Sequence, residues 1–277
     1  MGRRFLHSIV QPNTDLVASV SITPFDLPVN PLSFLILRLE IDNVAPTTAA
    51  IYSAMDDVID QITAIRVLHK GELIIQGSLR DLMVANMRAF DAYPGWARLS
   101  SLDATIRSMA FPLCFGHRMY DPLSAFPATT RGNLRFEMDA AADGAGYSDV
   151  NFSVSAVELI ESEPTSYRKY TTNSRAAVVG QYDALLPIGN PLRGILLFDP
   201  GLRATEAATY SWGDVKLLKD NVEQYYPNER IEVLASMLWA GKYGAMNWPG
   251  HVHETIAAVG AGVSSAEAEQ IEISGWN

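Results

Sequence analysis

Cysteine, positive charge and long apolar runs are all scarce in this chain. The one cysteine, Cys114, permits no internal disulfide, so packing or assembly must provide the stability. Lys and Arg number 21 against 31 Asp and Glu, giving a net charge of -10 and excluding a broad basic face for nucleic acid. The sequence has no run of 18 apolar residues and no apolar segment after residues 1–6, so we expect neither a membrane-spanning helix nor a signal peptide.

Familiar catalytic motifs are missing as well. The sequence contains no phosphate loop, GxGxxG fingerprint, GxSxG elbow or paired-cysteine metal site. The most chemical-looking run is H-V-H-E at positions 251–254, in which His251 and His253 could ligate a metal from one face of a strand. A cupin-like metalloenzyme would place a Glu after three or four intervening residues, where Ala257 and Ala258 stand. We therefore expect a polar loop here.

Two other groups of residues have a structural interpretation. Cys114 lies between Leu113 and Phe115, and this setting is typical of a buried small hydrophobe rather than a nucleophile. The nearby polar residues favour a loop salt bridge over a catalytic cluster. They are His117, Arg118 and Asp121.

Acidic residues leave a calcium site as an open alternative. Asp139 and Asp143, with Gly144 and Gly146, could hold Ca²⁺ through oxygen ligands, although their order lacks the EF-hand spacing. A second acidic group is interpreted as a solvated face; it comprises Asp56, Asp57 and Asp60. We assign no catalytic, cofactor-binding or metal residue and retain Ca²⁺ as the only open cofactor.

Short segments of alternating hydrophobicity are what the chain does contain. Strands are predicted at 16–23, 34–41, 104–113, 133–139, 151–160, 176–186, 194–198, 207–218 and 269–274. Each half has one clear helix, at 79–90 and at 229–239. The pattern predicts an all-β protein of two sandwiches or jelly rolls rather than α/β layers.

An internal repeat supports the division into two. The segment Ala64–Arg88 aligns without a gap on Asp214–Leu238, at an offset of 150, and each copy predicts strand, turn, short strand, N-cap and helix. The turn position is Gly71 in one copy and Asn221 in the other, two residue types that tolerate positive φ. The N-cap position is Ser78 and then Asn228.

A second element recurs in the same order. The tripeptide Asn-Pro-Leu precedes an apolar strand at 30–32 and again at 190–192. Two recurring elements indicate a duplicated domain. The charged, proline-bearing stretch 161–169 is the best boundary, so we predict domains at 1–165 and 166–277, the first with an N-terminal arm.

On the unit 65–82, the segment 112–138 and the repeat in the second half, the chain resembles the double jelly-roll major capsid proteins of tailless, membrane-containing icosahedral viruses, such as corticoviruses and tectiviruses. The resemblance implies two tandem eight-stranded jelly rolls, each with a short flanking helix. It implies a structural, non-enzymatic phage virion protein made in the host cytoplasm. It also implies pseudo-hexameric homotrimers that assemble an icosahedral shell over an internal membrane.

The same resemblance implies the partners. They are further copies of the chain and other capsid proteins, with no direct contact to nucleic acid, and the capped helix would pack between neighbouring barrels. Arg3 and Arg4 would contact the internal membrane. Exposed tryptophans would make subunit contacts, the candidates being Trp96, Trp212, Trp239, Trp248 and Trp276. The alternative is a β-sandwich carbohydrate-binding or carbohydrate-active protein, in which exposed Trp and Tyr stack on sugar rings.

Overall fold

The computed structural model describes the greater part of the first half of the chain and short stretches of the second. The described residues are 4–16, 21–43, 59, 61–90, 95–97, 106–141, 147–173, 180–186, 191–192, 194–195, 214–219, 222–223, 229–230 and 233. The chain divides into two compact units, Met1–Ser174 and Arg175–Asn277, and each is considered by itself. The predicted division into jelly rolls at 1–165 and 166–277 stays a prediction.

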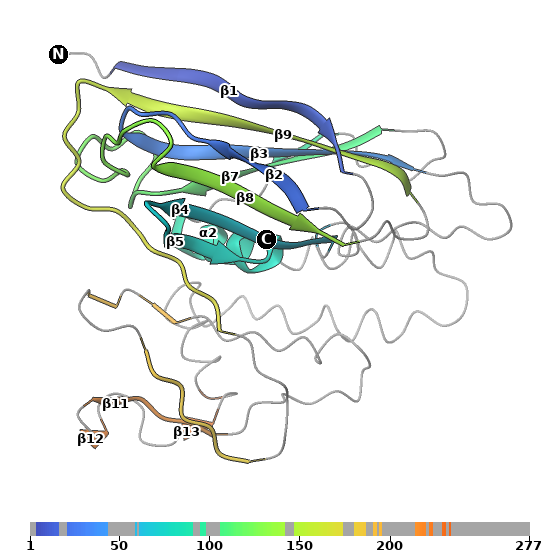
Figure 1. The fold of residues 1–277 in the computed structure, drawn as a ribbon. Coiled ribbons are helices and arrows are strands. Elements are labelled where there is room, and N and C mark those ends of the chain that lie inside the picture. The colour runs from blue at the N-terminus through green and yellow to red at the C-terminus, as the bar shows by residue number, and fades with distance from the viewer. Residues whose placement is uncertain are drawn as a thin grey trace, which may run out of the picture. The chain divides into compact units, whose positions relative to one another are not determined.

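The described part of the first unit contains two antiparallel sheets and the helix α2 (Figure 1). The larger sheet has the strand order β1 (Arg4–Asp15), β9 (Tyr147–Ile160), β3 (Leu32–Asn43), β7 (Ile106–Cys114) and β6 (Gly95–Ala97). The smaller sheet has the order β2 (Ser21–Asp26), β8 (Leu134–Ala140), β4 (Ile62–His69) and β5 (Glu72–Gly77). Helix α2 (Leu79–Phe90) lies between β5 and β6 in the chain.

The strand pairs of the first unit are nested. The first strand pairs with the last, β1 with β9, and inside this pair follow β2 with β8, β3 with β7, and β4 with β5. The pairs β3–β9 and β4–β8 join them into sheets. A long antiparallel hairpin folded over on itself has this order, which is that of an eight-stranded jelly roll, with β6 as a short addition. The all-β class is therefore confirmed.

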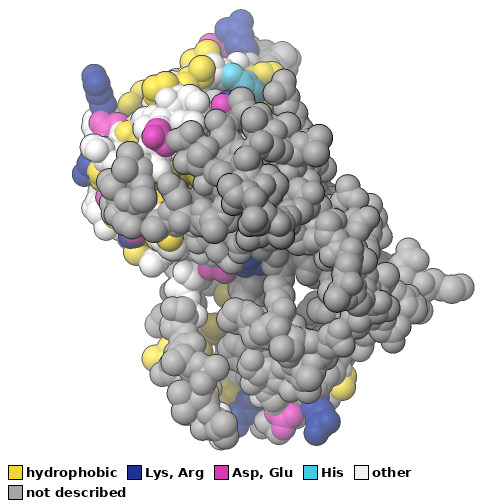
Figure 2. Space-filling view, turned by 90° about the vertical axis from the view of Figure 1, so that its right-hand side faces the viewer, with side chains coloured by type: hydrophobic (Ala, Val, Ile, Leu, Met, Phe, Trp, Pro, Cys, Tyr) yellow, Lys and Arg dark blue, Asp and Glu magenta, His cyan; other side chains and the backbone are white. Residues whose placement is uncertain are grey.

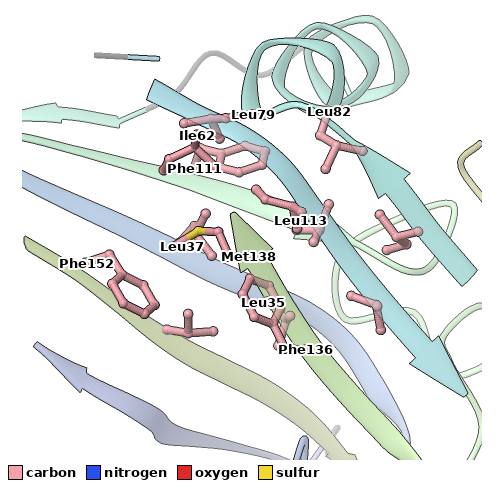
Figure 3. Close-up of a cluster of buried hydrophobic side chains, with 14 of the residues drawn as sticks. Leu35, Leu37, Ile62, Leu79, Leu82, Phe111, Leu113, Phe136, Met138 and Phe152 are labelled. Carbon is pink, nitrogen blue, oxygen red and sulfur yellow. The ribbon is translucent and has the colours of Figure 1, made fainter. Parts of the chain in front are cut away.

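The core lies between the two sheets, because alternate residues of each strand face inward. Arg38 and Glu40 of β3 form an ion pair on the outer face, while their neighbours are buried. Figure 3 shows the buried side chains of both sheets and of α2 converging on one cluster. The labelled members are Leu35, Leu37, Ile62, Leu79, Leu82, Phe111, Leu113, Phe136, Met138 and Phe152.

The predicted unit at 64–88 is confirmed as strand, turn, strand, cap and helix. Lys70 and Gly71 have φ of 52° and 83°, the pair of positive values that a tight two-residue hairpin turn requires. The Ser78 hydroxyl accepts the amide of Asp81 at 3.1 Å, and the Ser78 amide donates to the Asp81 carboxylate at 3.3 Å. This reciprocal pair caps the helix.

The apolar stripe of α2 packs into the core of its own unit. Leu79 and Leu82 are buried there. The polar interruption, Asn86, is also buried, and its amide donates to the carbonyl of Leu82 at 3.0 Å. Packing of this helix between neighbouring barrels stays a prediction.

The second unit repeats the tip of the hairpin. Strand β11 (Leu218–Lys219) pairs with β12 (Val222–Glu223) so that Leu218 faces Glu223 and Lys219 faces Val222. In the first unit, 150 positions earlier, residue 68 faces residue 73 and residue 69 faces residue 72. The two hairpin tips therefore have the same register. Further from the tip the registers differ, because residue 215 faces 229 whereas residue 65 faces 77.

Three predictions in the second half are wrong for the described residues. The helix predicted to begin at 229 does not begin there, because β13 (Glu229–Arg230) pairs with β10 (Asp214–Val215). This pairing uses the backbone groups that the first turn of a helix would need. The strands predicted at 176–186 and 194–198 are not formed at 180–186 and 194–195. The strand predicted at 269–274 lies outside the described residues.

The N-terminal prediction is wrong in position. A single strand was expected at 16–23, but β1 runs from Arg4 to Asp15 and β2 from Ser21 to Asp26. Within β1, Pro12 lies in the second of two register shifts, between Gln11 and Thr14, where the regular ladder is interrupted.

Candidate functional site

Cys114 is a buried core residue, as predicted. Its side chain is buried at the end of β7, among Phe34 and Val157. Burial raises the pKa of the Cys114 thiol to about 12, although the nearby Arg168 charge acts in the opposite direction. A thiol in this setting stays protonated at neutral pH and is unreactive.

His117 is bound into a structural network. Its Nδ1 accepts a hydrogen bond from Nε of Arg168 at 3.0 Å, and its amide donates to the Ser124 hydroxyl at 2.6 Å. Asp121 accepts from the amide two residues later in its own loop. The expected salt bridge of Asp121 with Arg118 is not among the ion pairs of the described residues.

The carboxylate of Asp139, a candidate calcium ligand, makes an ion pair instead. Asp139 forms an ion pair with Arg66, which also lies 4.0 Å from Glu137. Asp143, with the two neighbouring glycines at 144 and 146, lies outside the described residues. Within the part of the chain that the structure describes, no three His, Cys, Asp or Glu side chains gather as a possible metal site.

Several other candidates also fall outside the described residues. They are Arg3, the acidic positions 56, 57 and 60, the run 251–254, and the tryptophans at 212, 239, 248 and 276. Trp96 belongs to the short strand β6, where it pairs with Met109 of β7. None of the helices that the structure describes is long and apolar enough to cross a membrane.

Residues 161–173, which follow β9, are hydrogen-bonded back onto the jelly roll of the first unit, and the sequence did not predict this contact. We call these residues the exit segment. Its Thr165 amide donates to the carbonyl of Leu123 at 3.1 Å, and its Ser166 carbonyl accepts the Ala125 amide at 3.1 Å. These bonds hold the exit segment to the loop that follows β7.

Further along, the exit segment covers the outer edge of β5. The Tyr170 amide donates to Ile74 at 3.0 Å, and the Tyr170 carbonyl accepts from Gln76 at 2.9 Å. Lys169 forms an ion pair with Glu72 of β5. This hydrogen-bonded contact lowers the pKa of Glu72 and raises the pKa of Lys169. Covering an edge strand in this way prevents its pairing with another chain.

Exposed apolar side chains concentrate on β1, a strand that the sequence did not predict. Phe5, Leu6 and Ile9 are all exposed, Ile9 by 74%. Figure 2 shows hydrophobic side chains on the described surface of one face, where the Lys and Arg side chains stand apart from one another instead of forming a continuous field. The available signal was the run from Phe5 to Val10, which contains three strongly β-forming residues and no Lys, Arg, Asp or Glu.

Aromatic rings extend this surface without forming a flat platform. Phe5 lies 4.9 Å from Tyr120, centroid to centroid, at an interplanar angle of 54°. Tyr120 in turn lies 5.1 Å from Phe34 at 89°. Sugar rings stack on coplanar, exposed aromatic faces, so this tilted group does not favour the carbohydrate alternative. Tyr120 adopts a φ of 59°, and its amide donates to the Ser33 hydroxyl at 2.9 Å.

Comparison with known proteins gives no match to a family model or to a curated protein. Among solved structures, the chain is similar to a chain in the atomic structure of Sulfolobus turreted icosahedral virus. The two chains share 14% sequence identity with a TM-score of 0.43, and the match covers 56% of this chain and 45% of the viral chain. It is also similar to a chain of the PBCV-1 virus capsid, with 12% identity, a TM-score of 0.39, and coverage of 57% of this chain and 43% of that chain. The major capsid protein of bacteriophage PM2 matches with 17% identity, a TM-score of 0.35, and coverage of 60% of this chain and 52% of that chain. The matches span about half of those chains. With identities of 12–17% and TM-scores of 0.35–0.43, the chain is similar to viral capsid proteins but is not assigned to their family.

Proposed function

We propose that this protein is a structural capsid subunit with two jelly rolls in one chain. The observation that supports the proposal is the nested strand order of the first unit, together with the hairpin tip that recurs in the second unit at the same register. The proposal takes the capsid role from the sequence resemblance, because a fold alone does not define a function.

The arrangement of copies follows from having two similar units. Three copies of such a chain present six similar units, so a threefold object acquires a pseudo-hexagonal outline and can occupy hexagonal positions in an icosahedral shell. The role needs no catalysis. The described candidate side chains make structural contacts, which agrees with a non-enzymatic role.

The proposed function includes an internal membrane beneath the shell, which the N-terminal arginines would contact. Arg4 is exposed at the beginning of β1 and lies 3.6 Å from the Glu161 carboxylate. A surface ion pair of this kind is weak, so the guanidinium remains able to contact lipid phosphates. Arg3, the other candidate, lies outside the described residues.

Light scattering on the purified full chain tests the trimer. The expected mass is about 91 kDa, three times the chain mass of 30.3 kDa. Electron microscopy of concentrated samples is expected to show particles with hexagonal outlines. A mass of one chain at every concentration would overturn the proposed function.

A further inference from the structure

Three of the four sheet edges in the first jelly roll are protected against pairing with other chains. The exit segment covers β5 through Tyr170. Strand β2 contains Pro24 and a register shift between Ile22 and Phe25, and β6 has only three residues. Proline, bulges and shortness are the usual devices that block edge pairing. The remaining edge, β1, is 12 residues long.

The first half of β1 has none of these devices. Its register with β9 is unbroken from Arg4, opposite Ile160, to Ile9, opposite Ser155, and the shifts around Pro12 come only afterwards. No strand pairs with the outer edge of β1 in the described part of the chain. Half of the backbone donors and acceptors of residues 4–9 therefore point outward in the geometry of a regular ladder.

Side chains hold this half of the strand in position. Ser8 donates to the buried carboxylate of Glu158 at 3.0 Å, and Asn30 donates to the same carboxylate at 2.8 Å. On the opposite face, the ring of Phe5 packs against Tyr120. An edge that is already ordered loses little conformational freedom when it binds a partner.

We propose that β1 pairs in antiparallel fashion with β1 of a second copy, around a twofold axis at His7. An unpaired strand edge is complementary to its own antiparallel copy, because each strand offers the other its free N–H and C=O groups. The proposal rests on the proposed function, since it names one of the contacts through which copies in neighbouring trimers meet.

The side chains determine the register of this pair. Phe5, His7 and Ile9 alternate along one face of the strand. With His7 opposite His7, each Phe5 faces the Ile9 of the second copy, so that the exposed apolar side chains of this face cover each other. An aromatic ring opposite a β-branched side chain is a favourable cross-strand pair. Arg4 falls opposite Val10, so no two arginines are opposed.

A cysteine at the axis tests this register in the full chain. Directly opposed residues in an antiparallel pair have Cα atoms about 4.5–5.5 Å apart, within the range of about 4.4–6.8 Å that a disulfide spans. His7→Cys is therefore expected to form a covalent dimer under mild oxidation, measured by non-reducing electrophoresis. The native Cys114 is buried, with a thiol pKa of about 12, and contributes little background.

Leu123→Cys is the matched control, because Leu123 is 63% exposed on a loop outside β1. At equal concentration, at least tenfold faster dimer formation by His7→Cys is expected. Equal rates for the two variants would overturn the β1 contact. If trimers still form in that case, the proposed function stands; if the native chain is monomeric throughout, the proposed function itself fails.

Charge on the edge gives a second, independent measurement. The double variant Phe5→Lys, Ile9→Lys opposes lysines across the axis, and both side chains are already exposed, so folding is expected to persist. Sedimentation is expected to show trimers that no longer associate further, whereas Leu123→Lys associates like the native chain. Association of the double variant beyond trimers at native strength would contradict the inference.

Discussion

At Gly116 the loop after β7 passes directly against the backbone of Ser124. A Cβ atom at this position would lie 1.8 Å from the Ser124 carbonyl oxygen and 2.7 Å from its carbonyl carbon. Because the obstacle is backbone, no side-chain rotation relieves it. The same serine accepts the His117 amide through its hydroxyl, so the contact lies within the network that anchors the loop.

Gly116→Ala is therefore expected to destabilise the first jelly roll by about 2–3 kcal/mol, the cost of forcing atoms into a packed site. Denaturant unfolding measures this change. Gly194→Ala is the control, because a Cβ there would have no atom of the described residues within 4 Å beyond its chain neighbours. Equal midpoints for the two variants would show that the loop moves aside without cost.

The sequence predicted residues whose surroundings are local and missed those whose surroundings are distant in the chain. Cys114 was predicted to be buried because its two neighbours are apolar. The contact of Gly116 with residue 124 was not predicted, since it exists only in the folded loop. Glu158, which binds Ser8 across 150 positions, gave no signal at all.

At the scale of elements, local signals again decide what was predictable. The unit β4–β5–α2 was predicted because a turn, a cap and an apolar stripe lie within about 25 residues. The repeated helix was placed too early because β13 pairs with β10, and no propensity reveals that pairing. The exit segment looked like a linker, with Pro164 and several charges, but its backbone forms the border of β5.

The exit segment gives a prediction at this scale. Tyr170→Pro removes the amide that donates to Ile74, so the edge of β5 loses its cover near that point. Faster hydrogen exchange at the Gln76 amide and faster proteolysis after residue 160 are expected. Thr171→Pro is the matched control, since the Thr171 amide donates to no backbone carbonyl of the described residues, and the preceding Tyr170 is in a β-bridge with Ile75. Identical protection in the two variants would contradict the role of the exit segment.

For the whole molecule, the net charge of -10 on every copy opposes association. Apolar and backbone contacts must therefore overcome a repulsion that salt screens. The Debye length falls from about 30 Å at 0.01 M salt to about 8 Å at 0.15 M. Association beyond the trimer is consequently expected to strengthen over this range, as measured by light scattering. Weaker association at the higher salt would indicate contacts between opposite charges instead.

The nested strand pairs also bear on the synthesis of the chain. Strand β1 is made first, but its partner β9 ends at residue 160, so the outermost pair is the last that can close. At about 5–20 residues per second, a ribosome needs on the order of ten seconds or more to make the intervening chain. During that interval the apolar edge of a nascent β1 has no partner of its own. Among copies translated side by side on one message, that delay gives the edges of neighbouring chains an opportunity to meet before either jelly roll closes.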